Sequence, residues 1–154
     1  MTPTPMPISD TAARASGLSQ DDLSRLVDLA RRASLAGAEP LRRLFRQEVR
    51  VNIKGAAGNL VTEADHAAEA AVLALLAAET PDIGVLAEES GRRDGHSDLQ
   101  WCVDPLDGTT NFAHGFPFFG TSVGLTWQGM PLLGALAMPA LDQNFWAAPG
   151  MGAW

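Results

Sequence analysis

The sequence has little cysteine and a shortage of positive charge. Cys102 is the only cysteine, which excludes an intramolecular disulfide and a metal cage made of cysteines. Acidic residues outnumber basic ones by 18 to 11, so the formal net charge is -7. Without a positive field the chain is a poor partner for nucleic acid, whose backbone is a row of phosphates. A phosphate-handling protein of this charge would need metal cations to mask its own carboxylates.

Long apolar runs are also missing. The first ten residues, MTPTPMPISD, contain no basic segment followed by an apolar stretch, which is the pattern of a secretory signal. No uninterrupted apolar run approaches the roughly 18 to 20 residues of a membrane span. Together with the single cysteine, these features predict a soluble, cytoplasmic protein with no membrane partner. The hydrophobic content of 46% is enough for one folded domain with a core.

The beginning of the chain predicts a tail followed by a folded portion. Prolines among small polar residues leave residues 1–18 with too little apolar content to fold, so we expect a flexible tail there. Residues 19–154 are expected to form the α+β portion. Ser19 and Asp22 have the spacing of a helix-capping box, and apolar residues follow at helical intervals. Gly37 and Pro40 are expected to interrupt this helix, and apolar residues after them predict that helix continues or restarts toward Gln47.

A short strand, a loop and a second helix are expected next. Residues 49–53 alternate as a strand does, and residues 55–59 have the composition of a loop. Thr62 and Asp65 have the spacing of a second capping box, before a helix expected over residues 64–78.

The rest of the chain predicts strands separated by Gly, Pro and Asp turns, the last three forming an antiparallel meander. The expected strands are 84–88, 99–104, 121–127, 132–138 and 144–148. Helices followed by sequential strands favour an α+β fold with helices packed on a largely antiparallel sheet.

Carboxylates stand at the ends of several predicted elements. Asp104 follows the apolar strand Trp101-Cys102-Val103, and Pro105 is expected to end the strand pairing there. Gly108 would let the backbone approach a ligand closely, and Thr109 would open a helix whose free amides suit a phosphate. Glu88, at the end of another predicted strand, would add a third carboxylate to Asp104 and Asp107. Hard divalent cations such as Mg2+ prefer such oxygen ligands.

Each pattern also has a purely structural interpretation. Asp65 with Thr62 is explained as a helix cap, and Glu88-Glu89-Ser90 alone is typical of a solvated strand end. Asp-Pro-Leu-Asp-Gly alone is a plausible surface turn. The histidines are expected at the surface or in loops, outside any metal site: His66, His96 and His114.

Three segments taken together resemble the inositol monophosphatase family. They read NLVTEAD over residues 59–65, LAEES over 86–90 and WCVDPLDGTTNFAHGFP over 101–117, and the last of them is highly specific. The resemblance extends from about Ser19 to the end of the chain, where residues 148–154 resemble a glycine-containing hairpin of the family.

The resemblance implies a metal site. Glu88, Asp104 and the carbonyl of Leu106 would bind a first Mg2+ ion, and Asp104 and Asp107 would share a second. Two or three Mg2+ ions are implied, with Li+ as an inhibitor.

The resemblance also implies a catalytic arrangement. Leu106, Asp107, Gly108 and Thr109 would form the substrate-binding turn, with the last two holding the phosphate. Thr109 with Asp65 would orient and deprotonate the attacking water, and Glu88 would assist through its metal.

A layered α/β/α/β/α sandwich of the sugar phosphatase type and a homodimer are further implications. This chain would supply the N-terminal helices and the largely antiparallel sheet, because family members are about twice as long and their W-D-x-A-A-G-type motif does not occur here. Asn59 stands where the family usually has an acidic residue. The C-terminal half of the phosphatase domain is therefore expected to be missing.

The implied reaction is Mg2+-dependent hydrolysis of a phosphate monoester of a small polyol or sugar, with inositol monophosphate as the leading substrate. Histidinol phosphate, fructose bisphosphate and a 3'-phosphonucleotide remain as alternative substrates of the same chemistry. An inactive regulatory or binding module is the alternative from a different class.

Overall fold

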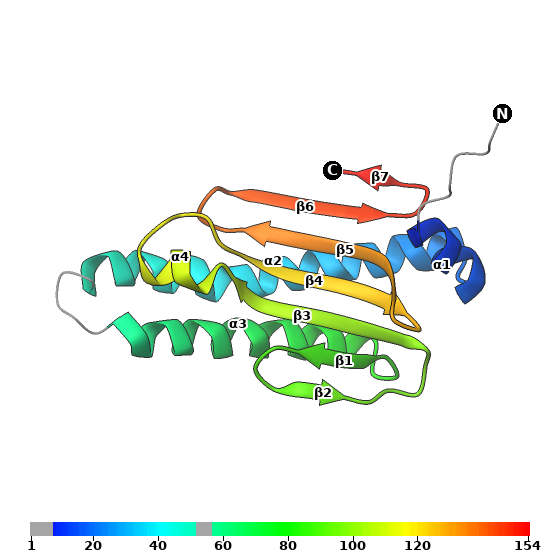
Figure 1. Ribbon diagram of the computed structural model, residues 1–154, viewed down its shortest axis with the longest axis horizontal. Helices are drawn as coiled ribbons and strands as arrows, with labels where there is room; N and C mark the ends of the chain where they lie inside the picture. The colour runs from blue at the N-terminus through cyan, green and yellow to red at the C-terminus, as the bar shows by residue number, and fades with distance from the viewer. Residues whose placement is uncertain (1–7, 52–56) are drawn as a thin grey trace.

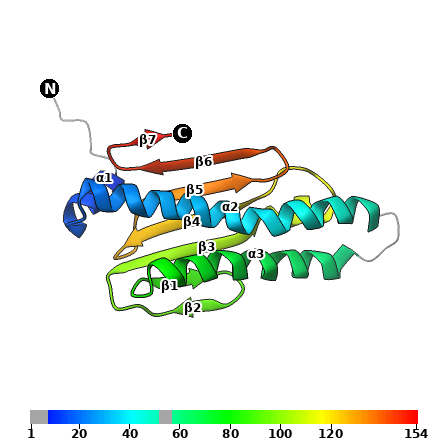
Figure 2. The same ribbon diagram turned by 180° about the vertical axis from the view of Figure 1, so that it is seen from behind.

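The computed structural model describes residues 8–51 and 57–154, and it places helices on one face of a seven-stranded sheet. Figure 2 shows α2 and α3 lying in front of the sheet, with α1 at one end. The elements are α1 (Ile8–Ser16), α2 (Gln20–Val51), α3 (Ala57–Glu79), β1 (Gly84–Ala87), β2 (Gly91–Arg93), β3 (Leu99–Asp107), α4 (Thr109–Ala113), β4 (Gly120–Trp127), β5 (Met130–Met138), β6 (Gln143–Ala148) and β7 (Gly152–Ala153).

The sheet has the order β2-β1-β3-β4-β5-β6-β7, and every neighbouring pair is antiparallel except β1 and β3. The expectation of an α+β fold with a largely antiparallel sheet is confirmed, as is the final meander (Figure 1). The five strands predicted after residue 80 all form, whereas the short strands β2 and β7 were not predicted. Within the described residues, no helix is long and apolar enough to cross a membrane.

The start of α2 agrees with the sequence prediction. The backbone N–H of Asp22 donates to Ser19 Oγ at 3.1 Å, and the backbone N–H of Ser19 donates to Asp22 Oδ2 at 3.1 Å. These reciprocal bonds form a capping box that satisfies amides left free at the helix start.

The prediction of a flexible tail through residue 18 is wrong for the part that the structure describes. Ile8–Ser16 form α1, and the side chains of Ala12 and Ala13 are buried in the main core. Local composition underestimated this segment because its small apolar residues gain stability by packing against the sheet. Residues 1–7 lie outside the described residues.

The predicted break in α2 is also absent, since the helix runs from Gln20 to Val51 with Pro40 inside it. The predicted strand 49–53 is wrong over 49–51, which are helical, and its last two residues lie outside the described residues. Gly37 serves close packing instead of a break. A Cβ atom built there would lie 2.7 Å from methyl groups of both Val72 and Thr121. Tertiary packing of the helix thus outweighs the local signals of Gly and Pro.

Helix α3 begins earlier than expected. It starts at Ala57, so Thr62 lies inside the helix and the predicted cap at Thr62 and Asp65 is wrong. The predicted loop 55–59 is helical from Ala57 onward, and its first two residues lie outside the described residues. Asp65 is therefore a mid-helix residue that capping does not explain.

Strand β3 continues past Pro105, contrary to expectation. It pairs with β4 up to Asp104 and again at Asp107, with an irregularity between these two residues. A bulge of this kind tolerates a residue that lacks an N–H group. The buried hydroxyl of Thr121 donates to the Pro105 carbonyl at 2.9 Å and anchors the bulge.

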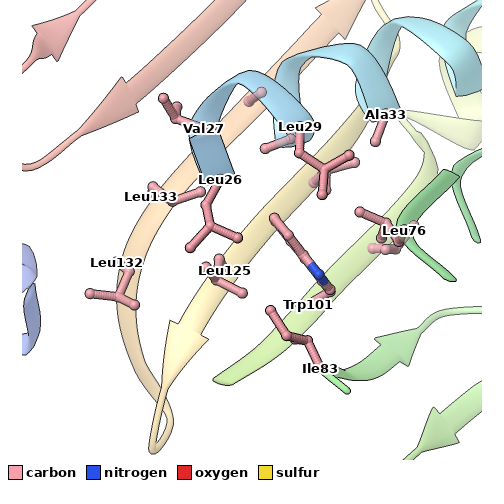
Figure 3. Packing of buried hydrophobic residues seen from close by; sticks show 14 of the residues in the cluster. Leu26, Val27, Leu29, Ala33, Leu76, Ile83, Trp101, Leu125, Leu132 and Leu133 are labelled. Carbon is pink, nitrogen blue, oxygen red and sulfur yellow. The ribbon is translucent and has the colours of Figure 1, made fainter. Parts of the chain in front are cut away.

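The main core lies between the helices and the sheet. Figure 3 shows Leu26 and Leu29 of α2 directed toward Trp101 and Leu125 of the sheet. Trp101 is fully buried, and its indole N–H donates to the Thr80 hydroxyl at 3.0 Å. A second core joins the far ends of α2 and α3 to α4, through Leu41, Leu44, Ala64, Ala68, Leu106, Phe112 and Phe119.

Candidate active site

The parallel pair of β1 and β3 places Glu88 beside Asp104. The register pairs Ala87 with Val103, and the backbone N–H of Glu88 donates to the Val103 carbonyl at 3.2 Å. Parallel strands end at the same edge of a sheet, so residues that follow equivalent positions become neighbours. Two carboxylates predicted from separate segments are thereby brought together.

The turn after β3 contains the other predicted residues. Gly108 has φ of 89°, a left-handed conformation that favours glycine, and a Cβ atom there would lie 2.9 Å from the Phe118 carbonyl oxygen. The Thr109 hydroxyl donates to the Leu106 carbonyl at 3.0 Å, while the Leu106 side chain is buried in the second core. Asp107 remains exposed between these anchored residues.

Two anchors of this turn were not among the candidate site residues. The Asn111 side-chain amide donates to the Phe118 carbonyl at 2.7 Å, and Thr121 holds the Pro105 carbonyl from β4. Asn111 lies within the family-like segment 101–117, so the sequence could have indicated it. Thr121 is a threonine near the start of a strand, which carries no sequence signal of its own. Thr121 thus fixes the backbone between Asp104 and Asp107, and Asn111 joins α4 to the segment that leads into β4.

Helix α3 brings Asp65 and Glu69 against the segment that follows β1. Both carboxylates are buried, with 8% and 4% of their residue surfaces exposed. Glu69 Oε2 accepts the backbone N–H of Glu89 and Oε1 accepts that of Ser90, both at 2.9 Å. Glu69 was not predicted from the sequence, although its position four residues after Asp65 on an apolar helix places both carboxylates on one face.

Crowding of carboxylates changes their protonation. Burial, followed by the charges of Glu89 and Glu88, raises the pKa of Asp65 to about 6. Burial, followed by the neighbouring carboxyls of Glu88 and Asp107, raises the pKa of Asp104 to about 7, and the backbone amide of Leu106 acts in the opposite direction. Glu88 raises the pKa of both Asp65 on α3 and Asp104 on β3, so the carboxylates of the two elements belong to one cluster.

The donor set suits a hard cation. Asp104 Oδ1 is buried and has no hydrogen-bond partner. Among the ion pairs of residues 8–51 and 57–154, one reaches Glu89, from His66 at 3.9 Å, and none reaches Asp65, Glu88, Asp104 or Asp107. An unsatisfied carboxylate oxygen in an anionic cluster is what a divalent cation would satisfy.

Not every predicted partnership is present in the described residues. No group of three or more His, Cys, Asp or Glu side chains there is arranged around one point, so the carboxylates stand as neighbouring pairs. The charges that act on Asp65 belong to Glu88, Glu89, Glu69 and His66, whereas the Thr109 hydroxyl bonds Leu106. A shallow hollow of about 390 Å³ on the sheet face includes Glu88 and Asp104 in its lining.

The fold and the site define a class of protein, a layered α+β chain whose carboxylates gather where β1 and β3 end. A model of the inositol monophosphatase family matches residues 22–154. The chain belongs to that family.

Known relatives agree with this assignment. An inositol-1-monophosphatase of Synechocystis sp. is 41% identical over 145 residues, covering 93% of this chain and 50% of the relative. A histidinol-phosphatase of Mycobacterium tuberculosis is 43% identical over 94 residues, covering 61% of this chain and 36% of the relative. The solved inositol monophosphatase of Anabaena superposes with a TM-score of 0.72 at 37% identity, over 86% of this chain and 47% of that one. The chain thus spans about half the length of the first curated relatives that it matches.

Proposed function

We propose that this chain supplies the metal-binding and phosphate-binding residues of a Mg2+-dependent phosphatase that hydrolyses a phosphate monoester. The observation that carries this proposal is the Glu88 and Asp104 pair directly after the last parallel pairing of β1 with β3, with the unpartnered Asp104 Oδ1. The family membership of the chain supports the same reaction class.

Glu88, Asp104 and the Leu106 carbonyl would hold one cation, and Asp104 with Asp107 would hold another. When bound, such ions neutralise phosphate charge, acidify a water molecule and stabilise the leaving oxygen. The proposed complement is two or three Mg2+ ions, and Li+ is proposed to inhibit.

The chain's own groups would bind the substrate and move the proton. A carboxyl with a pKa of about 6, as in Asp65, is mostly ionised near neutrality and can accept a proton from water. The Thr109 hydroxyl would orient that water. The turn over Leu106 to Thr109 would hold the phosphate, because Gly108 lets the backbone approach it closely.

Inositol monophosphate is the proposed substrate, in agreement with the name of the Synechocystis relative. Histidinol phosphate is the second candidate, because the relative named histidinol-phosphatase is 43% identical over its matched segment. A cytoplasmic homodimer is proposed from the family resemblance.

The test is phosphate release from inositol 1-phosphate with and without Mg2+, for the wild type and for Asp107→Asn. Asp82→Asn, an exposed carboxylate outside the site, is the matched control. Release that requires Mg2+ and disappears only in Asp107→Asn is the expected result. If phosphate is released faster from histidinol phosphate, fructose bisphosphate or a 3'-phosphonucleotide, that compound would replace inositol monophosphate as the proposed substrate. A folded wild type that neither binds Mg2+ in calorimetry nor releases phosphate would contradict the proposed phosphatase function. It would favour the alternative of a regulatory or binding module.

A further inference from the structure

Glu69 of α3 carries a buried carboxylate to which the proposed reaction assigns no role. It is 4% exposed, and within the described residues no Lys, Arg or His forms an ion pair with it. A buried charge without a counterion is costly unless hydrogen bonds replace the lost water. Glu69 has such bonds, since its two oxygens each accept one backbone N–H at 2.9 Å.

The residues bonded by Glu69 come directly after the proposed ligand Glu88. On one side of Glu88, its own N–H bonds the Val103 carbonyl of β3. On the other side, Glu69 holds the amides of Glu89 and Ser90. The backbone at Glu88 is therefore fixed from both the sheet and the helix.

This arrangement has a direct electrostatic consequence. Glu88 lies next to the carboxyl of Asp104 and close to Asp65, and it repels both groups when they are ionised. Repulsion would move the free Glu88 segment away from β3. Charge-assisted bonds to two consecutive amides, which are about twice as strong as neutral ones, oppose that movement.

We propose that Glu69 is a positioning residue whose paired bonds to the Glu89 and Ser90 amides hold Glu88 against Asp104 and so set the affinity of this pair for Mg2+. The affinity part of the inference rests on the proposed function, whereas the positioning part does not. A residue that only joined α3 to the sheet would affect stability without changing the metal affinity of the folded protein.

The experiment measures Mg2+ binding by calorimetry on the wild type, Glu69→Gln and Glu79→Gln. Glu79 is the matched control, because it is a carboxylate on the same helix whose bonds go to Arg32, away from the site. A glutamine at position 69 can accept only one of the two amides. We expect Glu69→Gln to weaken Mg2+ binding by about tenfold or more, as for other residues that orient a metal ligand, and Glu79→Gln to leave it unchanged. Equal affinity in folded Glu69→Gln and wild type would overturn the proposal.

A metal-free measurement separates this inference from the proposed function. Amide hydrogen exchange of Glu88, Glu89 and Ser90, in chelator, should be faster in Glu69→Gln than in the wild type or Glu79→Gln. Unchanged exchange would refute the positioning role. Faster exchange in a protein whose wild type binds no Mg2+ would retain the positioning role and refute the affinity claim together with the proposed function. If Glu69→Gln does not fold, Glu69→Asp keeps the charge but is too short to reach both amides, and the same outcomes apply.

Discussion

At the scale of single residues, the candidate site is a set of carboxylates that raise one another's pKa. Glu88 and Asp104 were predicted as ligands because carboxylates stand near the ends of predicted strands, although β3 continues past Pro105. The parallel pairing of β1 with β3, which makes them neighbours, was not predicted. Glu69 and Thr121 could not be predicted, because their roles depend on backbone groups from segments distant in the sequence. The capping role predicted for Asp65 is excluded because α3 begins at Ala57, eight residues earlier.

Replacing Asp65 by Asn should stabilise the metal-free protein at alkaline pH. The pKa of Asp65 is raised from 3.8 to about 6, so the folded state binds this proton more tightly than the unfolded state. The resulting destabilisation is absent below about pH 4, grows as the pH rises toward 6 and is complete above it. Denaturant unfolding in chelator should show Asp65→Asn more stable by about 3 kcal/mol at pH 8 and equal near pH 4. An advantage that does not depend on pH, or one shared by Asp82→Asn, would contradict this explanation.

Removing the Thr121 hydroxyl should destabilise the bulge in β3. Thr121→Val keeps the shape of the side chain but leaves the Pro105 carbonyl without its buried donor. The free energy of unfolding should fall by about 1 to 3 kcal/mol. Thr126→Val, on the same strand, removes a longer and less buried bond of 3.3 Å to Gln100 and should cost less. Equal losses in the two variants would show that the bulge does not depend on Thr121.

At the scale of elements, strands were predicted better than helix boundaries. Strands alternate in polarity and are separated by Gly, Pro and Asp turns, which are local signals, and the five strands predicted after residue 80 all form. The strand predicted at residues 49–53 does not, because residues 49–51 belong to α2. The ends of α1, α2 and α3 depend instead on packing. Ala12 and Ala13 are buried, and Gly37 lies against two other elements, and no local pattern contains that information.

Gly37→Ala should destabilise the protein although alanine is the better helix former. The added methyl group would meet Val72 and Thr121 at 2.7 Å, and overpacking of this kind costs about 1 to 3 kcal/mol, more than the roughly 1 kcal/mol gained in helix propensity. Thermal unfolding of Gly37→Ala, Val72→Ala and the double variant measures the interaction free energy between positions 37 and 72. The double variant should lose less stability than the sum of the two single variants, and strict additivity would contradict the proposed contact.

At the scale of the whole molecule, helices α1–α3 cover one face of the sheet, while the other carries exposed apolar groups. Leu86 and Phe145 are 46% and 44% exposed, and Phe145 lies across from Leu136 in a hollow of about 540 Å³. Exposed apolar patches of this kind promote association.

Phe145→Ser should therefore reduce concentration-dependent association in sedimentation velocity. Leu35→Ser, which removes an exposed apolar side chain from the helix side, should leave this association unchanged. If instead Leu35→Ser reduced association and Phe145→Ser did not, the associating surface would lie on α2.

The parallel pairing of β1 with β3 also bears on how the site forms in time. The proposed ligands and their anchors on α3, β1 and β3 are near neighbours in the sequence, and the meander of β5 to β7 contributes none of them. Contacts between nearby segments close small loops at low entropic cost and tend to form early. The carboxylates that follow β1 and lie on β3 can thus be brought together before the β5 to β7 meander completes the sheet.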